Sequence, residues 1–108
     1  MKQVLLIATG GTIACRETEN GLSPTLTGAQ LLSLLPGLGD LCTVTVCDLM
    51  HLDSTDLTAA DRMRIARTVW DSRAQYDGFV IAHGTDTLSY TAALLHHVLP
   101  GCDRPAVL

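Results

Sequence analysis

The 108-residue sequence has no long hydrophobic run, no cluster of basic residues and no G-x-G-x-x-G or G-x-x-x-x-G-K-[ST] phosphate-binding motif. Its opening apolar run, Val4 to Ala8, is too short for a membrane span or a signal-peptide core, so we expect a cytoplasmic protein. The net charge of −4 and the scattered basic residues argue against nucleic acid or an anionic membrane as a partner. This composition favours a small molecule as the ligand, and the missing phosphate-binding motifs count against a nucleotide.

Metal-binding patterns are also absent. The four cysteines (Cys15, Cys42, Cys47 and Cys102) lack the C-x-x-C spacing of zinc sites and redox motifs, and we interpret them as buried, reduced thiols. Cys42 and Cys47 fall in one expected strand at an odd separation, which places their side chains on opposite faces. The adjacent His96 and His97 are interpreted as a solvent-exposed pair on a helix. We therefore predict no metal site and no cofactor.

What the sequence does contain is a regular alternation of apolar strands and amphipathic helices. Continuous or alternating β-branched runs predict strands at 4–8, 42–49 and 79–82, and the start of a fourth at 104–108. Helices are predicted from Thr27 to the stop at Pro36-Gly37, after Thr58, and from about Leu88 to Pro100. Thr27 with Gln30, and Thr58 with Asp61, are typical of helix N-terminal caps. The polar stretch 16–24 is expected to be a loop.

This alternation predicts an α/β fold with a parallel sheet and helices on both faces, of the flavodoxin-like or Rossmann-like three-layer type. In such sheets ligands bind beyond the carboxyl ends of the strands. Three polar segments occupy those positions in the sequence: TGGT at 9–12, LDSTD at 52–56 and HGTDT at 83–87. We expect all three to meet at one crevice.

The chemistry of these segments suits acyl transfer. Gly10 and Gly11 leave the backbone beside Thr12 without side chains, so that a substrate can approach and amide groups can form an oxyanion hole, although a simple glycine turn is the alternative. In the second segment, Thr85 and Asp86 set a hydroxyl beside a carboxylate and can relay protons.

Other residues of these segments have plainer interpretations. Asp86 and Thr87 are also good caps for the following helix, and His83 is interpreted as a structural hydrogen-bonding residue rather than a base. Carboxylates and hydroxyls at 53–56 can hold the ammonium and carboxylate groups of an amino acid, but alone they are no more specific than a turn.

Taken together, ATGGTIA at 8–14 and DGFVIAHGTDTLSYTAA at 77–93 resemble the two signature segments of the asparaginase/glutaminase family. The segment LDSTD between them is most similar to the cytoplasmic type I branch. The resemblance implies an amidohydrolase that converts L-asparagine to L-aspartate and ammonia, with Thr12 as the nucleophile that forms an acyl-enzyme. Thr85 and Asp86 match the family residues that transfer protons together with a lysine. Such groups are needed because an alcohol is a poor nucleophile without an activating base. The implied substrate-binding residues are Gly11, Asp53, Ser54, Thr55, Gly84, Thr85 and Asp86.

Two positions depart from the family pattern. Leu22 stands where the family commonly has a tyrosine, and Lys2, the only lysine, lies at the start of the first strand and cannot match the catalytic lysine. The resemblance therefore implies that 1–108 is the first part of the large domain of a longer homo-oligomer, a dimer or tetramer, that also has a smaller second domain. Alone, the chain is expected to be inactive, with one sheet edge and one helix-packing face uncovered.

Two other functions stay open on the sequence. One is a related amidase that acts on glutamine, as in the glutaminases or the tRNA-dependent amidotransferases. The other is a flavodoxin-like module that binds a small molecule without chemistry, which the fold class alone permits.

Overall fold

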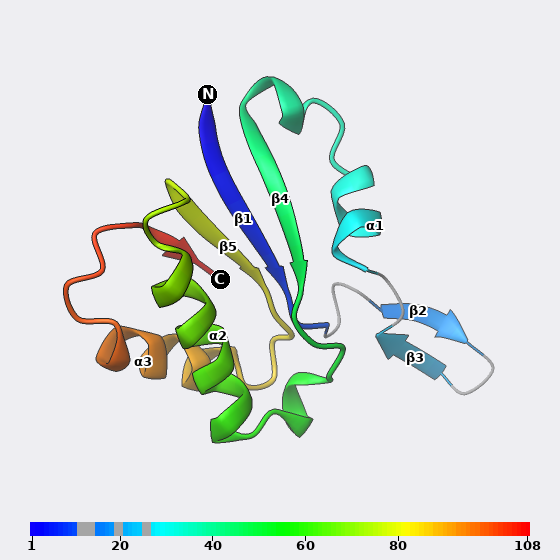
Figure 1. The fold of residues 1–108 in the computed structure, drawn as a ribbon. Coiled ribbons are helices and arrows are strands. Elements are labelled where there is room, and N and C mark those ends of the chain that lie inside the picture. The colour runs from blue at the N-terminus through cyan, green and yellow to red at the C-terminus, as the bar shows by residue number, and fades with distance from the viewer. Residues whose placement is uncertain (11–14, 19–20, 25–26) are drawn as a thin grey trace.

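The computed structural model describes residues 1–10, 15–18, 21–24 and 27–108, with the backbone alone for 15–18 and 21–24. Its main feature is a parallel sheet of four strands in the order β4-β1-β5-β6 (Figure 1). The strands are β1 (Lys2–Ala8), β4 (Cys42–Asp48), β5 (Gly78–Ala82) and β6 (Ala106–Val107). The predicted parallel sheet is confirmed, and each of its strands lies within two residues of its expected bounds.

The register of the sheet brings the carboxyl ends of three strands level with one another. Ala8, at the end of β1, pairs with Asp48 of β4 on one side and with Ala82 of β5 on the other. The chain leaves β1 toward β4 and then crosses back to β5, so β1 and β5 flank the topological switch point. Ligands of doubly wound sheets bind in the crevice at this point.

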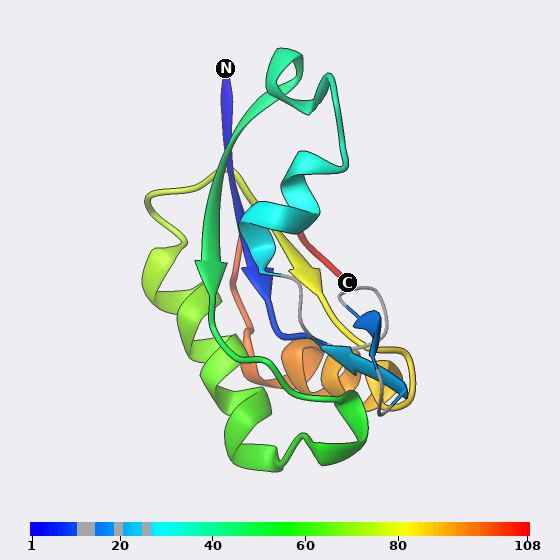
Figure 2. The same cartoon turned by 90° about the vertical axis from the view of Figure 1, so that its right-hand side faces the viewer.

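Helices cover both faces of the sheet, as predicted. The helices are α1 (Gly28–Ser33), α2 (Ala59–Ser72) and α3 (Leu88–Val98), with short 3₁₀ turns η2 (Leu38–Asp40) and η3 (Ser54–Asp56). Figure 2 shows α2 and α1 on opposite sides of the sheet. Both predicted capping boxes are present, at the N-termini of α1 and α2. Helix α1 ends at Ser33, short of the predicted stop, because the residue before a proline disfavours helical backbone.

The main core lies between the sheet and the helices α2 and α3. Alternate residues of the central strands point into it, as the two-residue period of a strand requires. Its fully buried members include Ile7, Ile65, Val69, Phe79 and Ile81.

The opposite face of the sheet is less well covered. An apolar cavity of about 370 Å³ lies between α1 and the sheet, lined in part by Leu6, Leu31 and Val80. Val80 keeps 42% of its surface exposed. The expectation that a helix-packing face is uncovered stays a prediction.

The expectation of a loop at 16–24 is wrong. Strands β2 (Cys15–Thr18) and β3 (Gly21–Pro24) pair antiparallel, with Cys15 opposite Pro24 and Thr18 opposite Gly21. A hairpin is held by main-chain hydrogen bonds, so it needs no apolar alternation in its side chains.

The thiols of Cys42, Cys47 and Cys102 are free, as predicted, but they are partly rather than fully buried. Cys47 packs against the main core, whereas Cys42 lines a cavity beneath α1, so the two point to opposite faces of β4 as expected. The side chain of Cys15 lies outside the described residues.

Candidate active site at the carboxyl edge of the sheet

Thr9 joins the ends of the central strands. It follows β1 directly and is 1% exposed. Its amide and its hydroxyl both donate to the carbonyl of Ala82 at the end of β5, at 3.1 and 2.6 Å. Its own carbonyl accepts from the amide of Leu52 at 2.9 Å. The segments that leave β1, β4 and β5 are thus hydrogen-bonded to one another where the strands end.

Gly10 continues this contact in a way that only glycine allows. Its φ is +95°, and a Cβ built on it would lie 2.8 Å from the nitrogen and 2.9 Å from the oxygen of Leu52. The first glycine of TGGT therefore passes backbone to backbone against the start of LDSTD. Gly11 and Thr12, the two predicted site residues that follow, lie outside the described residues.

The segment LDSTD forms a compact turn. Asp53 caps η3, and its Oδ1 accepts from the amide of Thr55 at 3.1 Å and from the hydroxyl of Thr55 at 3.0 Å. Ser54 is 1% exposed, and its Oγ has no hydrogen-bond partner among the described residues. A buried hydroxyl without a partner is unusual, because an unsatisfied polar group costs free energy.

The segment HGTDT lies against this turn. The hydroxyl of Thr87 donates to the carbonyl of Ser54 at 2.7 Å, a bond between segments 33 residues apart in the chain. Thr85 and Asp86 are exposed beside it, and Gly84 is buried. The predicted convergence of HGTDT with LDSTD is confirmed, and TGGT joins them as far as Gly10.

The expected side-chain cap of the third helix is wrong. Thr87 occupies the N-cap position of α3, but no side-chain cap bond forms there, and Asp86 lies outside the cap position. The hydroxyl of Thr87 is used instead for the carbonyl of Ser54, a partner that local spacing cannot reveal.

His83 is buried in a hydrogen-bonded position, in agreement with its structural interpretation. Its Nδ1 lies 2.5 Å from the carbonyl of Gly84, and its Nε2 lies 2.8 Å from the hydroxyl of Thr91 in α3. Arg62 of α2 donates from Nε to the same hydroxyl at 3.1 Å. Sequence reasoning missed Thr91 and Arg62, because nothing in the spacing of α2 and α3 marks a shared polar contact.

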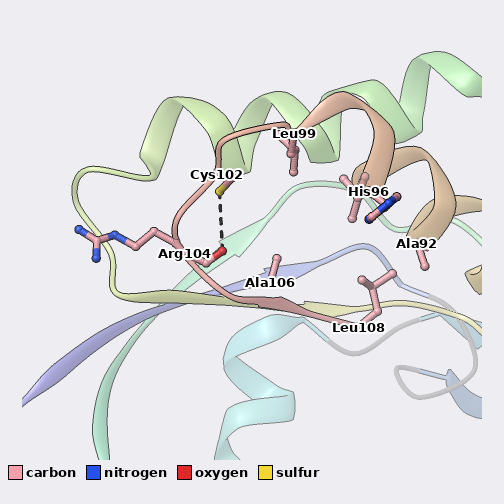
Figure 3. Close-up of a pocket in the computed structure, with 8 residues that line it drawn as sticks. Ala92, His96, Leu99, Cys102, Arg104, Ala106 and Leu108 are labelled. Carbon is pink, nitrogen blue, oxygen red and sulfur yellow. Dashed lines mark hydrogen bonds between the residues drawn. The ribbon is translucent and has the colours of Figure 1, made fainter.

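Two further features, the His96–His97 pair and a cavity beside β6, lie away from this edge of the sheet. His96 and His97 are exposed, and their rings pack edge to face with 5.3 Å between the ring centroids. A cavity of about 320 Å³ beside β6 is lined by His96, Cys102 and Arg104 among others, and Figure 3 shows the Cys102 thiol directed at the carbonyl of Arg104. Within the described ranges, no three histidine, cysteine or acidic side chains come together as a metal site. No helix in the described part of the chain has the length and apolar character of a membrane span.

Comparison with known proteins decides the family. The model of the family described as "Asparaginase, N-terminal" matches residues 3–108. The chain belongs to this asparaginase family. The resemblance inferred from the two signature segments is thereby confirmed.

Individual relatives agree in sequence and in structure. The L-asparaginase of Thermococcus kodakarensis is 38% identical over 98% of this chain. A solved structure of the thermostable L-asparaginase from this organism superposes with a TM-score of 0.72 at 37% identity over 86% of the chain. A structure described as a probable cytoplasmic L-asparaginase from Campylobacter jejuni has a TM-score of 0.81 at 28% identity over 88% of the chain. A glutamyl-tRNA(Gln) amidotransferase subunit from Methanopyrus kandleri is 38% identical over the whole chain.

These relatives are all considerably longer. This asparaginase-family chain spans 33% of the T. kodakarensis protein, 25% of the M. kandleri protein, and 29% and 31% of the two solved chains.

Proposed function

We propose that this chain forms part of an amidohydrolase that converts L-asparagine to L-aspartate and ammonia. The observation that carries the proposal is the meeting of the three hydroxyl-rich and carboxylate-rich segments at the switch point of the sheet. Two bonds hold that meeting together, Leu52 to Thr9 and Thr87 to Ser54. Membership of the asparaginase family and relatives named L-asparaginase support it.

In the proposed mechanism Thr12 is the nucleophile. Its hydroxyl oxygen adds to the side-chain amide carbon, the carbon–nitrogen bond breaks, and ammonia leaves with the proton that the hydroxyl lost. Water then hydrolyses the acyl-enzyme ester to release aspartate and restore the hydroxyl. Thr85 and Asp86 are proposed to move the protons, and the backbone at Gly11 is proposed to stabilise the oxyanion.

The turn at Asp53 to Thr55 is proposed to hold the amino-acid end of the substrate. The Oγ of Ser54, which has no hydrogen-bond partner among the described residues, supports this role, since a ligand carboxylate can supply a hydrogen-bond acceptor. Gly84 is proposed to bind the substrate through its backbone beside the exposed Thr85 and Asp86, and Asp86 is proposed to bind the substrate ammonium.

The domain organisation is part of the proposal. We expect 1–108 to be the first part of a larger domain in a longer, cytoplasmic homo-oligomer, because the relatives extend well beyond the matched region. A catalytic lysine has to come from outside this chain, since Lys2 lies at the far end of β1 from the site. The 108-residue chain alone is therefore expected to release no ammonia from asparagine.

The test is the replacement Thr12→Ala in the complete protein that contains this chain. Ammonia release from asparagine should fall by at least about 1,000-fold, because the acyl-enzyme cannot form. Thr45→Ala is the matched control, since Thr45 is exposed on β4, away from the site. Turnover retained by Thr12→Ala would remove this residue from the nucleophile's role.

A related amidase acting on glutamine is the second candidate, and the M. kandleri amidotransferase relative favours it. Values of kcat/KM for asparagine and glutamine in the complete protein separate the two, because a higher value for glutamine supports the second. A non-catalytic binding module would instead show binding of asparagine, aspartate or a mononucleotide in titration calorimetry, with no ammonia released.

A further inference from the structure

A chain of polar contacts runs from α2 through α3 to the HGTDT segment. Arg62 of α2 donates from Nε to the hydroxyl of Thr91 in α3 at 3.1 Å. The same hydroxyl lies 2.8 Å from Nε2 of His83, and the other ring nitrogen lies 2.5 Å from the carbonyl of Gly84. Thr91 is 0% exposed and His83 is 6% exposed, so both contacts of the His83 ring are shielded from water.

The direction of each bond follows from counting donors and acceptors. The Gly84 carbonyl can only accept, so Nδ1 of His83 carries a proton, and in the corresponding neutral tautomer Nε2 is an acceptor. Thr91 therefore donates its hydroxyl proton to Nε2 and accepts from the guanidinium of Arg62. Each ring nitrogen of His83 has one partner and the Thr91 hydroxyl has two, so these contacts hold the ring in one orientation.

Arg62 also reaches the other segment of the site. Its Nη1 donates to the carbonyl of Leu57 at 3.1 Å, directly after the turn η3 that contains Ser54. The planar guanidinium thus holds two acceptors from one rigid group. One arm leads through Thr91 and His83 to Gly84, the residue before Thr85, and the other arm ends on Leu57, the residue after the LDSTD turn.

We propose that Arg62 and Thr91 are positioning residues that set the HGTDT segment and the LDSTD turn relative to each other. This inference rests on the proposed amidohydrolase function. Neither residue touches the substrate. They act through His83, which contacts the carbonyl of Gly84 next to the proposed proton-transfer residues, and through the carbonyl of Leu57 next to the proposed substrate-binding turn. Displacing a reacting group by about 1 Å can cost about 100-fold in rate, so a loss of this order is expected when the chain of contacts is cut.

The decisive variant is Thr91→Val in the complete protein, which keeps the shape of the side chain and removes the hydroxyl. We expect kcat for asparagine to fall about 10- to 100-fold with a smaller change in KM, and Thr91→Ser to recover most of the rate. Arg62→Met should change kcat and KM together, because it releases both the Thr91 and the Leu57 contacts. Arg67→Met is its control, since Arg67 is an exposed arginine on the same helix.

Val69→Ala distinguishes positioning from simple stability. Val69 is fully buried in α2 and outside the polar chain, so this variant should lower the unfolding midpoint while kcat stays within about twofold of the unmodified enzyme. The proposal is overturned if Thr91→Val loses stability to the same degree as Val69→Ala yet keeps its kcat.

Hydrogen exchange separates this inference from the proposed function. If the unmodified protein releases no ammonia, the amidohydrolase assignment fails. The positioning role is then judged by the hydrogen-exchange rates of the backbone amides of residues 83–87. Faster exchange there in Thr91→Val, but not in Thr91→Ser or Val69→Ala, supports it. Equal exchange in Thr91→Val and the unmodified protein overturns it.

Discussion

The replacement Gly10→Ala tests how the first polar segment is seated against the second. The new methyl group meets two separate penalties. The backbone at Gly10 has a φ of +95°, a conformation that costs a residue with a side chain about 1–3 kcal/mol. The Cβ would also lie 2.8 Å from the nitrogen and 2.9 Å from the oxygen of Leu52, and relieving such crowding costs about 1–3 kcal/mol more.

The expected loss in the free energy of unfolding is therefore about 2–6 kcal/mol, from a total that is about 5–15 kcal/mol in a typical domain. The contacting atoms belong to the backbone of Leu52, so the crowding cannot be relieved by a side-chain rotation. Ammonia release should also fall, because the segment that leads to Thr12 and the turn that contains Ser54 are pushed apart.

Two other glycines provide matched controls for urea or guanidinium denaturation of the complete protein. Gly37 has a φ of +86° with no atom within 4 Å of a built Cβ, so Gly37→Ala should cost only the backbone term, about 1–2 kcal/mol. Gly39 has neither feature, and Gly39→Ala should be neutral or stabilising by up to about 1 kcal/mol. A loss for Gly10→Ala no larger than that for Gly37→Ala would refute the close approach to Leu52.

Further outcomes concern the core, a helix cap and the dependence of stability on pH. Phe79→Ala should cost about 3–5 kcal/mol in chemical denaturation, because this side chain is 1% exposed between the sheet and the helices. Thr58→Ala should cost about 1 kcal/mol in the same assay through loss of the cap of α2, and Thr58→Ser should recover most of it. The pKa of Asp61 is lowered from its ordinary 3.8 mainly by the amide of Thr58, and that of Asp77 mainly by the amide of Gln3. A carboxylate whose pKa is lowered in the folded state contributes stability that is fully present above pH 3.8. This stability is lost as the pH falls through the pKa of the folded state. Asp61→Asn and Asp77→Asn should therefore each flatten the acid limb of a curve of stability against pH. An unchanged acid limb in both variants would contradict this assignment.

Much of the fold could be predicted from the sequence because it depends on neighbours along the chain. Apolar runs and β-branched alternation predicted the strands, and the pairs Thr27 with Gln30 and Thr58 with Asp61 predicted the helix starts. Parallel order then placed TGGT, LDSTD and HGTDT at one edge, because the carboxyl ends of parallel strands meet there. The polar hairpin was missed, since main-chain pairing leaves little trace in side-chain periodicity.

The sequence alone thus determined the strands of the parallel sheet and the three α-helices, the edge of the sheet that bears the candidate site, and the asparaginase family. Only the tertiary structure decided which partners the polar groups take across segments far apart in the chain. Thr87 bonds to Ser54 rather than capping its own helix, and Arg62 reaches Thr91 across 29 residues of sequence. A hydroxyl or guanidinium can bond to any acceptor that folding brings within about 3 Å, so its choice depends on the packed helices and not on spacing along the chain.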